Sequence, residues 1–384
     1  MKELYGRKIG FDAKRAVQNN TGLGNYSRQA IEILSEYFPD NNYYLFAPRR
    51  KENPRLANLY QRRNVSFIFP SGLHKRFASL WRMAGIKKDI VAAGVEIFHG
   101  LSNEIPLGLA KTGVKTIVTI HDLIFMRYPQ FYKPIDCAIY RFKFRYACRK
   151  AHHIIAVSEC TKRDIVSFFN IDANKITVIY QSCHPSFAVR VDPQCRLATV
   201  EKYGLPPQFI LNVGTVESRK NLMLAVEALP HLPPTLHLVA VGKPTAYQQE
   251  VEKRAEQLGV EQRLHILNNV PFAHLPALYQ AAAVFVYPSF FEGFGIPIIE
   301  ALTSETPVIA AVGSCLEEAG GNHSLYIAPN DHRALARAVI QIIDNPQQAN
   351  LMRAKGKEYV QRFSLQNIAS ALMKTYSDLL IVDC

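Results

Sequence analysis

The chain has no run of about 18 uncharged apolar residues, so no segment of it is expected to span a membrane. Its seven cysteines are odd in number and never occur as Cys-x-x-Cys, and its twelve histidines show no metal-ligand spacing. These patterns argue against a disulfide framework and against a structural zinc site. The start of the chain also lacks a signal-peptide pattern. We therefore expect a reduced, cytoplasmic protein.

The length of 384 residues exceeds the roughly 250–300 residues at which single cores stop growing, so two domains are expected. Apolar strands and amphipathic helices alternate along the whole chain, which predicts α/β domains with parallel sheets. The alternation breaks after Tyr180 and resumes near residue 209. We place an N-terminal domain at 1–185 and a C-terminal domain at 186–363.

The expected elements follow from the same pattern. In the N-terminal domain we expect strands near 7–11, 43–47, 65–69, 95–98, 114–120, 153–157 and 175–179. In the C-terminal domain we expect strands near 209–213, 236–241, 263–267, 283–287, 307–310 and 325–328. Helices are expected between them, at 23–37, 75–93, 135–150 and 159–169 among others, and the stretch 346–380 reads as wholly helical.

Charge is divided unevenly. Residues 1–190 hold 30 Lys/Arg against 14 Asp/Glu, a net of +16, whereas the remainder holds 15 against 18, a net of −3. The basic half suggests an anionic partner. Within it, segment 75–88 places the only tryptophan among basic residues, and Phe77, Leu80, Trp81 and Ala84 would share one helical face. Such a helix either packs that face into its own domain or lies on an anionic membrane surface.

Residues 286–302 form the most informative segment. They run from an apolar strand, through a turn with Glu292, Gly293 and Gly295, into a helix that should begin near Pro297. Glycines let a ligand approach the backbone, and a helix start favours an anion such as phosphate. Two carboxylates, Glu292 and Glu300, would repel that phosphate unless they bound hydroxyl groups. The combination points to a nucleotide-sugar site.

Two turns of the N-terminal domain carry further candidates. Gly22 and Gly24 lie between the first strand and the first helix, where backbone amides could approach a ligand. A dinucleotide-binding reading is weak, because Ser27 takes the place of the third glycine. His121 stands at the carboxyl end of a strand, where open α/β sheets bind their ligands. The plainer alternatives are a simple helix entry for the glycines and a loop hydrogen bond for the histidine.

A third turn follows the first strand of the C-terminal domain. It contains Gly214, Arg219, Lys220 and Asn221. Two fixed cations could stabilise the charge of a departing diphosphate. The plainer alternative is a solvated Arg-Lys pair, with Asn221 capping the next helix.

Glu-x7-Glu around Gly-Phe-Gly resembles the signature of retaining glycosyltransferases of the GT-B fold, of the family 4 type (glycosyl transferases group 1). The His-Asp and Gly-x-x-x-x-x-Lys-Asn segments match this family in order, and the chain looks most like bacterial mannosyltransferases of surface-polysaccharide assembly. The resemblance implies two Rossmann-like domains with parallel sheets facing across a cleft, and a C-terminal helix, about 364–384, that returns to the N-terminal domain.

The resemblance also implies roles for single residues. His121 and Glu292 become the catalytic candidates, with His121 beside the transferred sugar. The donor-binding candidates are Gly22, Gly24, Gly214, Arg219, Lys220, Gly293, Phe294, Gly295 and Glu300. In this reading Arg219 and Lys220 hold the diphosphate and Glu300 bonds the ribose hydroxyls.

The expected reaction moves a hexose, with mannose favoured, from a GDP- or UDP-linked donor to the hydroxyl of a glycan or lipid-linked acceptor. No carboxylate is placed as a covalent nucleophile, which favours front-face attack. The chain lacks Asp-x-Asp, and two cations would balance the diphosphate, so no metal or other cofactor is expected. Membrane contact through 75–88 would hold the enzyme at the inner face of the membrane.

Two alternatives stay open at this point. A sugar-nucleotide epimerase of the same fold would act on the donor without an acceptor. A nucleic-acid-binding protein would explain the basic half, but the basic residues form no recognised reading motif and the Glu-x7-Glu segment would have no role. We therefore expect no nucleic acid partner.

Overall fold

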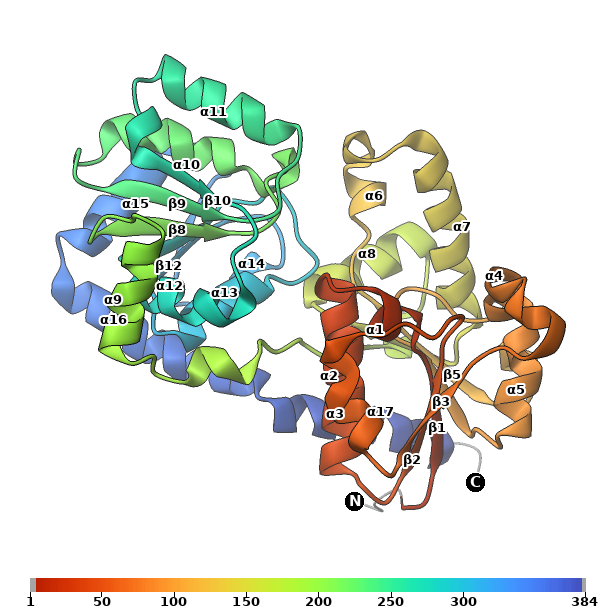
Figure 1. The fold of residues 1–384 in the computed structure, drawn as a ribbon. Coiled ribbons are helices and arrows are strands. Elements are labelled where there is room, and N and C mark those ends of the chain that lie inside the picture. The colour runs from red at the N-terminus through yellow and green to blue at the C-terminus, as the bar shows by residue number, and fades with distance from the viewer. Residues whose placement is uncertain (1–4, 382–384) are drawn as a thin grey trace. The chain divides into compact units, whose positions relative to one another are not determined.

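The computed structural model describes residues 5–381, and its contacts divide the chain into two units (Figure 1). The N-terminal unit runs to Gln181 and resumes at Ser364, and the C-terminal unit runs from Ser182 to Phe363. The first boundary lies four residues before the one placed at 185 from the sequence, and the second coincides with the one placed at 363. Among the described residues, no helix combines the length and apolar character that crossing a membrane requires.

The N-terminal unit is built on a seven-stranded parallel sheet, counted over the described residues, with the order β3-β2-β1-β4-β5-β6-β7. Its strands are β1 (Lys8–Asp12), β2 (Asn42–Phe46), β3 (Val65–Ile68), β4 (Ile97–Gly100), β5 (Lys115–Ile120), β6 (His153–Ala156) and β7 (Ile176–Val178). Each lies within two residues of its predicted position. The first strand pairs with β2 on one side and β4 on the other, so the order reverses between β1 and β4.

Helices α2 (Gly22–Tyr37), α7 (Pro134–Lys150), α8 (Glu159–Phe169) and α17 (Leu365–Ile381) belong to this unit. Helix α17 packs against α2, and its Ile368, Leu372, Met373 and Tyr376 join the core formed by β1, β2 and α2. The last stretch of the chain thus completes the first hydrophobic core, as the blue ribbon beside the red one shows in Figure 1.

The prediction of a wholly helical stretch at 346–380 is wrong at one point. Helix α16 (Pro346–Tyr359) continues into a 3-10 turn, η12 (Val360–Phe363), and α17 begins only after Ser364. The Ser364 hydroxyl accepts a hydrogen bond from the Asn367 backbone N–H at 3.3 Å. A serine that caps a new helix in this way ends the preceding one, and the chain changes unit there.

The predicted single helix at 75–93 is also broken. It consists of α4 (Ala78–Leu80), a π-helical turn η3 (Trp81–Gly85) and α5 (Ile86–Ala92). The Trp81 ring is fully buried and donates its Nε1–H to Asp89 at 2.5 Å. Because the wider turn rotates the side chains, Trp81 packs inward with Ile86 and Ile90, whereas Leu80 is exposed. The predicted shared apolar face is therefore wrong, and Phe77 and Ala84 are exposed too.

The C-terminal unit holds a six-stranded parallel sheet, again over the described residues, with the order β10-β9-β8-β11-β12-β13. Its strands are β8 (Phe209–Val213), β9 (His237–Val241), β10 (Leu264–Leu267), β11 (Val284–Tyr287), β12 (Val308–Ala311) and β13 (Leu325–Ile327). The order reverses between β8 and β11. In open α/β sheets such a reversal leaves a crevice at the carboxyl ends of the two strands.

Helices α10 (Leu222–Ala228), α11 (Tyr247–Gln257), α13 (Ile296–Thr303) and α15 (His332–Ile343) surround this sheet with α16. Apolar side chains of α10, α11, α15 and α16 pack on β8, β9 and β11 in one core. Helix α13 begins directly after the glycine turn that follows β11, with a proline in its first turn.

Candidate active site

The turns that follow β8 and β11 bring together residues that lie about 70 positions apart in the sequence. Lys220 Nζ lies 2.5 Å from Glu292 Oε1 and 2.7 Å from the Tyr287 hydroxyl. Arg219 Nη1 lies 3.0 Å from Glu292 Oε2. One carboxylate is therefore held by two cations at the point where the strand order reverses. We call Arg219, Lys220, Tyr287 and Glu292 the ionic cluster.

Backbone contacts fix the two turns to each other. Arg219 donates from Nη1 to the Phe291 carbonyl at 2.7 Å, and its own carbonyl accepts from the Phe290 N–H at 2.9 Å. Asn221 has a positive φ of 58° and donates from Nδ2 to the carbonyls of Pro288 and Pro329 at 3.0 and 2.7 Å. Its side chain makes no cap bond to α10. Asn221 thus ties loops together, which its position in the sequence did not indicate.

The ionic cluster keeps Glu292 ionised. Burial alone would raise the pKa of Glu292, but the charges of Lys220 and Arg219 and their hydrogen bonds outweigh burial and lower it to about 2. Burial would lower the pKa of Arg219, yet Glu292 and Glu217 raise it above its usual value. Glu217 Oε1 lies 2.7 Å from Arg219 Nη2. Two cations and two carboxylates make a neutral group, and Glu292 can act as an acceptor but not as an acid.

The glycine turn after Glu292 has a fixed shape. Gly295 has a φ of +119°, and a Cβ there would lie 3.1 Å from Leu316 Cδ2. Cys315 Sγ lies 3.1 Å from the Glu292 carbonyl and 3.0 Å from the Phe294 carbonyl, close to the backbone on both sides of Gly293. The Phe294 ring is buried edge-on against Phe363. The Phe294 ring therefore anchors the turn, and donor binding by the backbone amides of Gly293–Gly295 stays a prediction.

Gly214 lies beside the ionic cluster. A Cβ on Gly214 would be in ordinary contact with Lys220 Cδ at 3.8 Å and with the Tyr287 ring at 3.9 Å. A Cβ on Gly242, directly after β9, would lie only 1.7 Å from the Gly214 carbonyl oxygen. Gly242 is thus required for the close approach of two loops at the sheet edge. The only signal for it in the sequence was a glycine that directly follows an apolar strand.

Glu300 stands one turn inside α13. Its Oε2 accepts a hydrogen bond at 2.8 Å from the Tyr279 hydroxyl of α12 (Leu275–Ala281). Burial raises the pKa of Glu300 to about 7, and the bond from Tyr279 offsets this only in part. The two glutamates of the Glu-x7-Glu pair therefore differ: Glu292 is a firm carboxylate, whereas Glu300 changes charge near neutral pH.

His121 follows β5 in the N-terminal unit, as predicted, and it is buried. Its Nε2 lies 2.9 Å from the Leu101 carbonyl oxygen, which can only accept, so Nε2 carries the proton. Nδ1 faces the Gln181 amide nitrogen at 3.4 Å. Burial lowers the pKa of His121 to about 4. A neutral imidazole tied at both nitrogens can position a ligand but is a poor general base at neutral pH.

A buried polar network lies next to the His121 ring. The Tyr26 ring meets it edge-on at 4.6 Å between centroids, and the Tyr26 hydroxyl lies 3.0 Å from Thr119 Oγ1. His99 Nε2 lies 2.7 Å from the same Thr119 oxygen, and His99 Nδ1 lies 2.7 Å from the Tyr376 hydroxyl of α17. Burial lowers the pKa of His99 to about 3. The sequence prediction missed His99, because its hydrogen-bond partners lie on two other elements, β5 and α17.

The two glycines of the first helix have different surroundings. They stand in the first turn of α2, not in the loop before it. A Cβ on Gly24 would lie 1.8 Å from the Asn19 carbonyl oxygen, so the close approach of the preceding turn explains this glycine. Gly22 is exposed with nothing within 4 Å of a Cβ. Contact of either glycine with a donor stays a prediction.

The structure brings one group of predicted residues together. Gly214, Arg219, Lys220, Glu292, Gly293 and Gly295 gather at the ends of β8 and β11, with Glu300 on the helix that follows. His121, Gly22 and Gly24 belong to the other unit. Within residues 5–381 no group of three or more His, Cys, Asp or Glu side chains has the arrangement of a metal site. The expectation that no metal is required remains a prediction.

Two family models match the chain. The Glycosyltransferase Family 4 model matches residues 30–186, and the Glycosyl transferases group 1 model matches residues 199–359. The O-antigen chain mannosyltransferase B of Escherichia coli is 29% identical over 286 residues, 73% of this chain and 74% of that protein. The O-antigen chain mannosyltransferase RfbU of Salmonella typhimurium is 28% identical over 251 residues, 65% of this chain and 66% of its own length.

Solved structures share the fold over nearly the whole chain. Sucrose-phosphate synthase from Thermosynechococcus elongatus matches 98% of this chain and 100% of its own with a TM-score of 0.78 at 20% identity. Anabaena HepE, in complex with UDP and glucose, matches 97% and 100% with a TM-score of 0.73 at 18% identity. The family models confirm the predicted glycosyltransferase family, and the solved structures confirm the predicted fold class; retention stays a prediction. The chain belongs to the glycosyltransferases that the family 4 and group 1 models describe, and it has the GT-B fold.

Proposed function

We propose that this glycosyltransferase moves a hexose from a nucleotide diphosphate sugar to the hydroxyl of a glycan or lipid-linked acceptor. Mannose from GDP-mannose is favoured over UDP-linked sugars, since the relatives described above are named as O-antigen mannosyltransferases. The observation that carries the proposal is the ionic cluster at the carboxyl ends of β8 and β11. A diphosphate is the anion that suits two adjacent fixed cations.

The charges of the cluster suggest how the donor enters. Without a ligand, Glu292 and Glu217 neutralise Lys220 and Arg219. A diphosphate that binds both cations competes with Glu292 for them. Glu292 then accepts hydrogen bonds from the hydroxyls of the sugar and thereby positions it. Gly214, Gly293 and Gly295 offer backbone at the same strand ends. Two cations then balance the departing diphosphate, and no divalent metal is required.

Glu300 bonds the ribose hydroxyls in this proposal. The Glu300 residue is half-buried. Among the described residues, its carboxyl group accepts a hydrogen bond only from the Tyr279 hydroxyl, through one of its two oxygens. A ribose offers two neighbouring O–H donors, which would favour the carboxylate form.

The acceptor binds to the N-terminal unit, with His121 in contact with the transferred sugar. Glu292 is engaged as a hydrogen-bond acceptor, and we place no covalent nucleophile. The hydroxyl of the acceptor substrate therefore attacks the anomeric carbon from the face that the diphosphate leaves, with retention of configuration. Segment 75–88 brings the enzyme to an anionic membrane surface on the cytoplasmic side; the exposed Phe77, Leu80 and Met83 support this part.

Calorimetry with GDP-mannose, UDP-glucose and the free nucleotides tests the donor site. We expect binding without added metal, lost in Lys220→Ala but retained in Lys243→Ala, a matched lysine that is exposed after the neighbouring strand β9. Equal binding by both variants would contradict the site. Incubation with an acceptor pool, followed by NMR of the new anomeric proton, tests retention; conversion of the donor alone would instead support an epimerase.

A further inference from the structure

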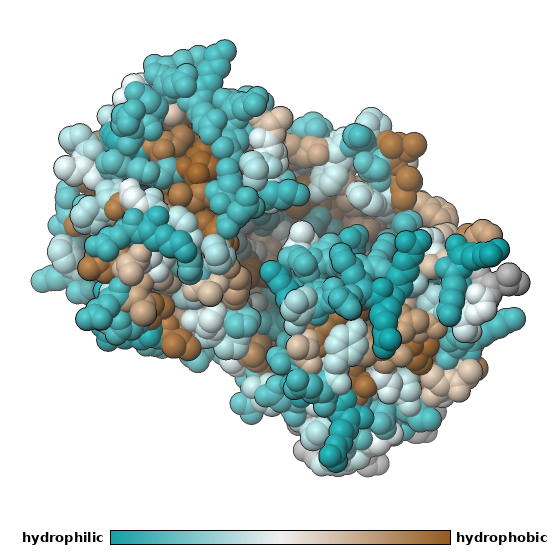
Figure 2. All heavy atoms as spheres, in the orientation of Figure 1, coloured by the Kyte–Doolittle hydropathy of each residue, from teal (hydrophilic) through white to brown (hydrophobic). Residues whose placement is uncertain are grey.

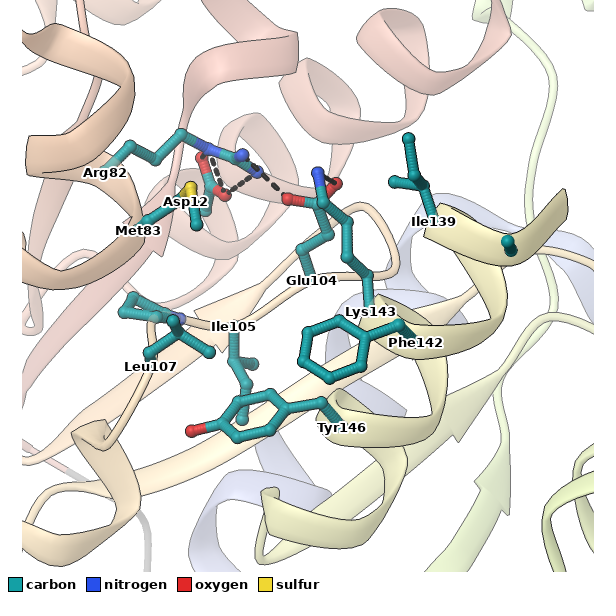
Figure 3. A pocket seen from close by; sticks show the side chains of 12 residues that line it. Asp12, Arg82, Met83, Glu104, Ile105, Leu107, Ile139, Phe142, Lys143 and Tyr146 are labelled. Carbon is teal, nitrogen blue, oxygen red and sulfur yellow. Dashed lines mark hydrogen bonds and ion pairs between the residues drawn. The ribbon is translucent and has the colours of Figure 1, made fainter. Parts of the chain in front are cut away.

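A cavity of about 420 Å³ lies in the N-terminal unit, at the ends of β1 and β4 where the strand order of that sheet reverses. Asp12 closes β1, Glu104 follows β4, and Arg82 reaches in from the π-helical turn (Figure 3). One face of the cavity comes from α7. None of the residues that line this cavity has a role in sugar or nucleotide binding in the function proposed above.

The charged side chains of the lining lie at one end of the cavity, and each of them is paired there. Arg82 bonds Asp12 with Nε at 2.9 Å and Glu104 with Nη1 at 2.8 Å, and Lys143 bonds Glu104 at 3.3 Å. Figure 3 shows this paired network to one side of the open space, with apolar side chains around the rest. Those side chains are Met83, Ile105, Leu107, Ile139, Phe142 and Tyr146. Such a lining favours an apolar ligand group.

The apolar surface continues from the cavity to the outside. Ile139 is 45% exposed and Phe142 is 67% exposed on α7. Figure 2 shows brown and tan spheres over α7. An extended apolar group could therefore enter along α7.

Two cations beside the paired network have no ion pair or side-chain hydrogen bond with the described residues. These are Lys14 and Arg15, directly after Ala13. Lys14 lies within the electrostatic reach of Arg82, Asp12 and Glu104, and burial, Arg82 and Arg15 together lower its pKa. Arg15 in turn lies near enough to His121 to act on its charge. A bound anion would relieve the repulsion among these cations.

We propose that this cavity binds the alkyl chain of an amphiphile whose phosphate head sits on Lys14 and Arg15. The Lys14 backbone N–H donates to the Asp12 carboxylate of the cavity lining at 3.2 Å, so the head would be held at the end of the cavity where β1 ends. The amphiphile is then the lipid part of the acceptor, and this last identification rests on the proposed function. The cavity and the cations stand independently of it.

Titration of the whole protein with n-octyl phosphate, below the concentration at which it forms micelles, tests the proposal without any donor. Calorimetry gives the affinity, and the fluorescence of Trp81, which directly precedes Arg82 and Met83, gives a second readout. Burying one methylene strengthens binding roughly three- to fourfold. We therefore expect n-octyl phosphate to bind on the order of a hundredfold more tightly than n-butyl phosphate, and more tightly than n-octanol or inorganic phosphate.

Matched variants on one helix separate the cavity from general surface adsorption. Ile139→Asn changes a cavity residue, and Ile135→Asn changes the same residue type one turn earlier, 68% exposed and outside the lining. We expect the first to weaken n-octyl phosphate at least fivefold and the second to leave it unchanged. Lys14→Gln should weaken n-octyl phosphate but not n-octanol, whereas Lys88→Gln, at an exposed lysine of α5, should change neither.

Equal affinity for the butyl and octyl phosphates would overturn the proposal, and so would equal effects of the two isoleucine variants, which would indicate partition onto the surface. Binding of inorganic phosphate as tight as that of n-octyl phosphate would leave an anion site without a chain site, and would overturn it too. Nucleotide binding to the C-terminal unit is measured separately. If it fails while n-octyl phosphate binds, the proposed function falls and the cavity assignment stands.

Discussion

The candidate site residues of the two units differ in charge. In the C-terminal unit, Arg219 and Lys220 pair with a buried, ionised Glu292 at the edge of the sheet. In the N-terminal unit, the neutral rings of His99 and His121 are buried in a network of uncharged hydrogen bonds. The comparison teaches that the donor-site candidates are ionised groups in direct contact with one another, whereas the ring of His121 and its supporting network are kept neutral by burial.

The largest effect should come from removing a cation of the ionic cluster. Lys220→Ala should lower turnover by roughly 10²–10³-fold, the usual cost of losing one group that stabilises developing negative charge. Arg219 still pairs with Glu292, so the melting temperature should change little. Initial rates and thermal melting of the variant measure both quantities.

Lys243→Ala is the control for this prediction and should match the unchanged protein. A Lys220→Ala enzyme with full turnover would show that the charge contrast between the units has no role in catalysis. A large fall in melting temperature would instead assign Lys220 to structure.

The two glutamates of the C-terminal unit should give a smaller, pH-dependent effect. The pKa of Glu300 is raised to about 7, so the carboxyl group of the free enzyme is protonated below that pH. Ribose hydroxyls bind the carboxylate, and the affinity for GDP-mannose should therefore be nearly full at pH 8 and fall roughly tenfold between pH 8 and 6. Calorimetry at pH 6, 7 and 8 measures this dependence.

Glu300→Gln sharpens that prediction, because an amide cannot titrate. Its affinity should be lower at pH 8 and flat across the range. A pH slope that persists in Glu300→Gln would place the titrating group elsewhere. Glu292, whose pKa is lowered to about 2, contributes no slope in this window.

The smallest effect is expected in the neutral network of the N-terminal unit. Tyr376→Phe leaves Nδ1 of the buried His99 without its partner, which should lower the free energy of unfolding by about 1–2 kcal/mol. Urea denaturation followed by the fluorescence of Trp81, the only tryptophan, reports on this unit. Nucleotide affinity should not change.

Tyr37→Phe serves as the matched control, since Tyr37 is exposed on the surface of α2. Equal stability of Tyr376→Phe and Tyr37→Phe would mean that the network does not stabilise the unit. A change in nucleotide affinity would show that the network of the N-terminal unit and the candidate donor site of the C-terminal unit are not independent.

The parts that could be read from the sequence share a local cause. Parallel strands covered on both faces appear as short apolar runs, so every predicted strand of both sheets is present within about two residues. The donor-side candidates also stand in short segments after strands. Their meeting follows from the strand order, because β8 and β11 are neighbours and the two turns share one edge.

The parts that could not be read depend on distant contacts. The π-helical turn at Trp81 exists because the indole is buried and bonded to Asp89. His99 acquires its role only when Tyr376, 277 positions later, returns to the first core. The ring of Phe294 packs against Phe363, and no local pattern in the sequence indicated this contact.

The return of α17 also bears on how the protein matures during synthesis. The C-terminal unit is one uninterrupted stretch and can close its core as soon as Phe363 has left the ribosome. The first 181 residues must wait for the last helix, which fills their core with Leu372 and Tyr376. The unit made first is therefore finished last, and a released chain that ends before Ser364 would carry a complete C-terminal unit and an incomplete N-terminal unit.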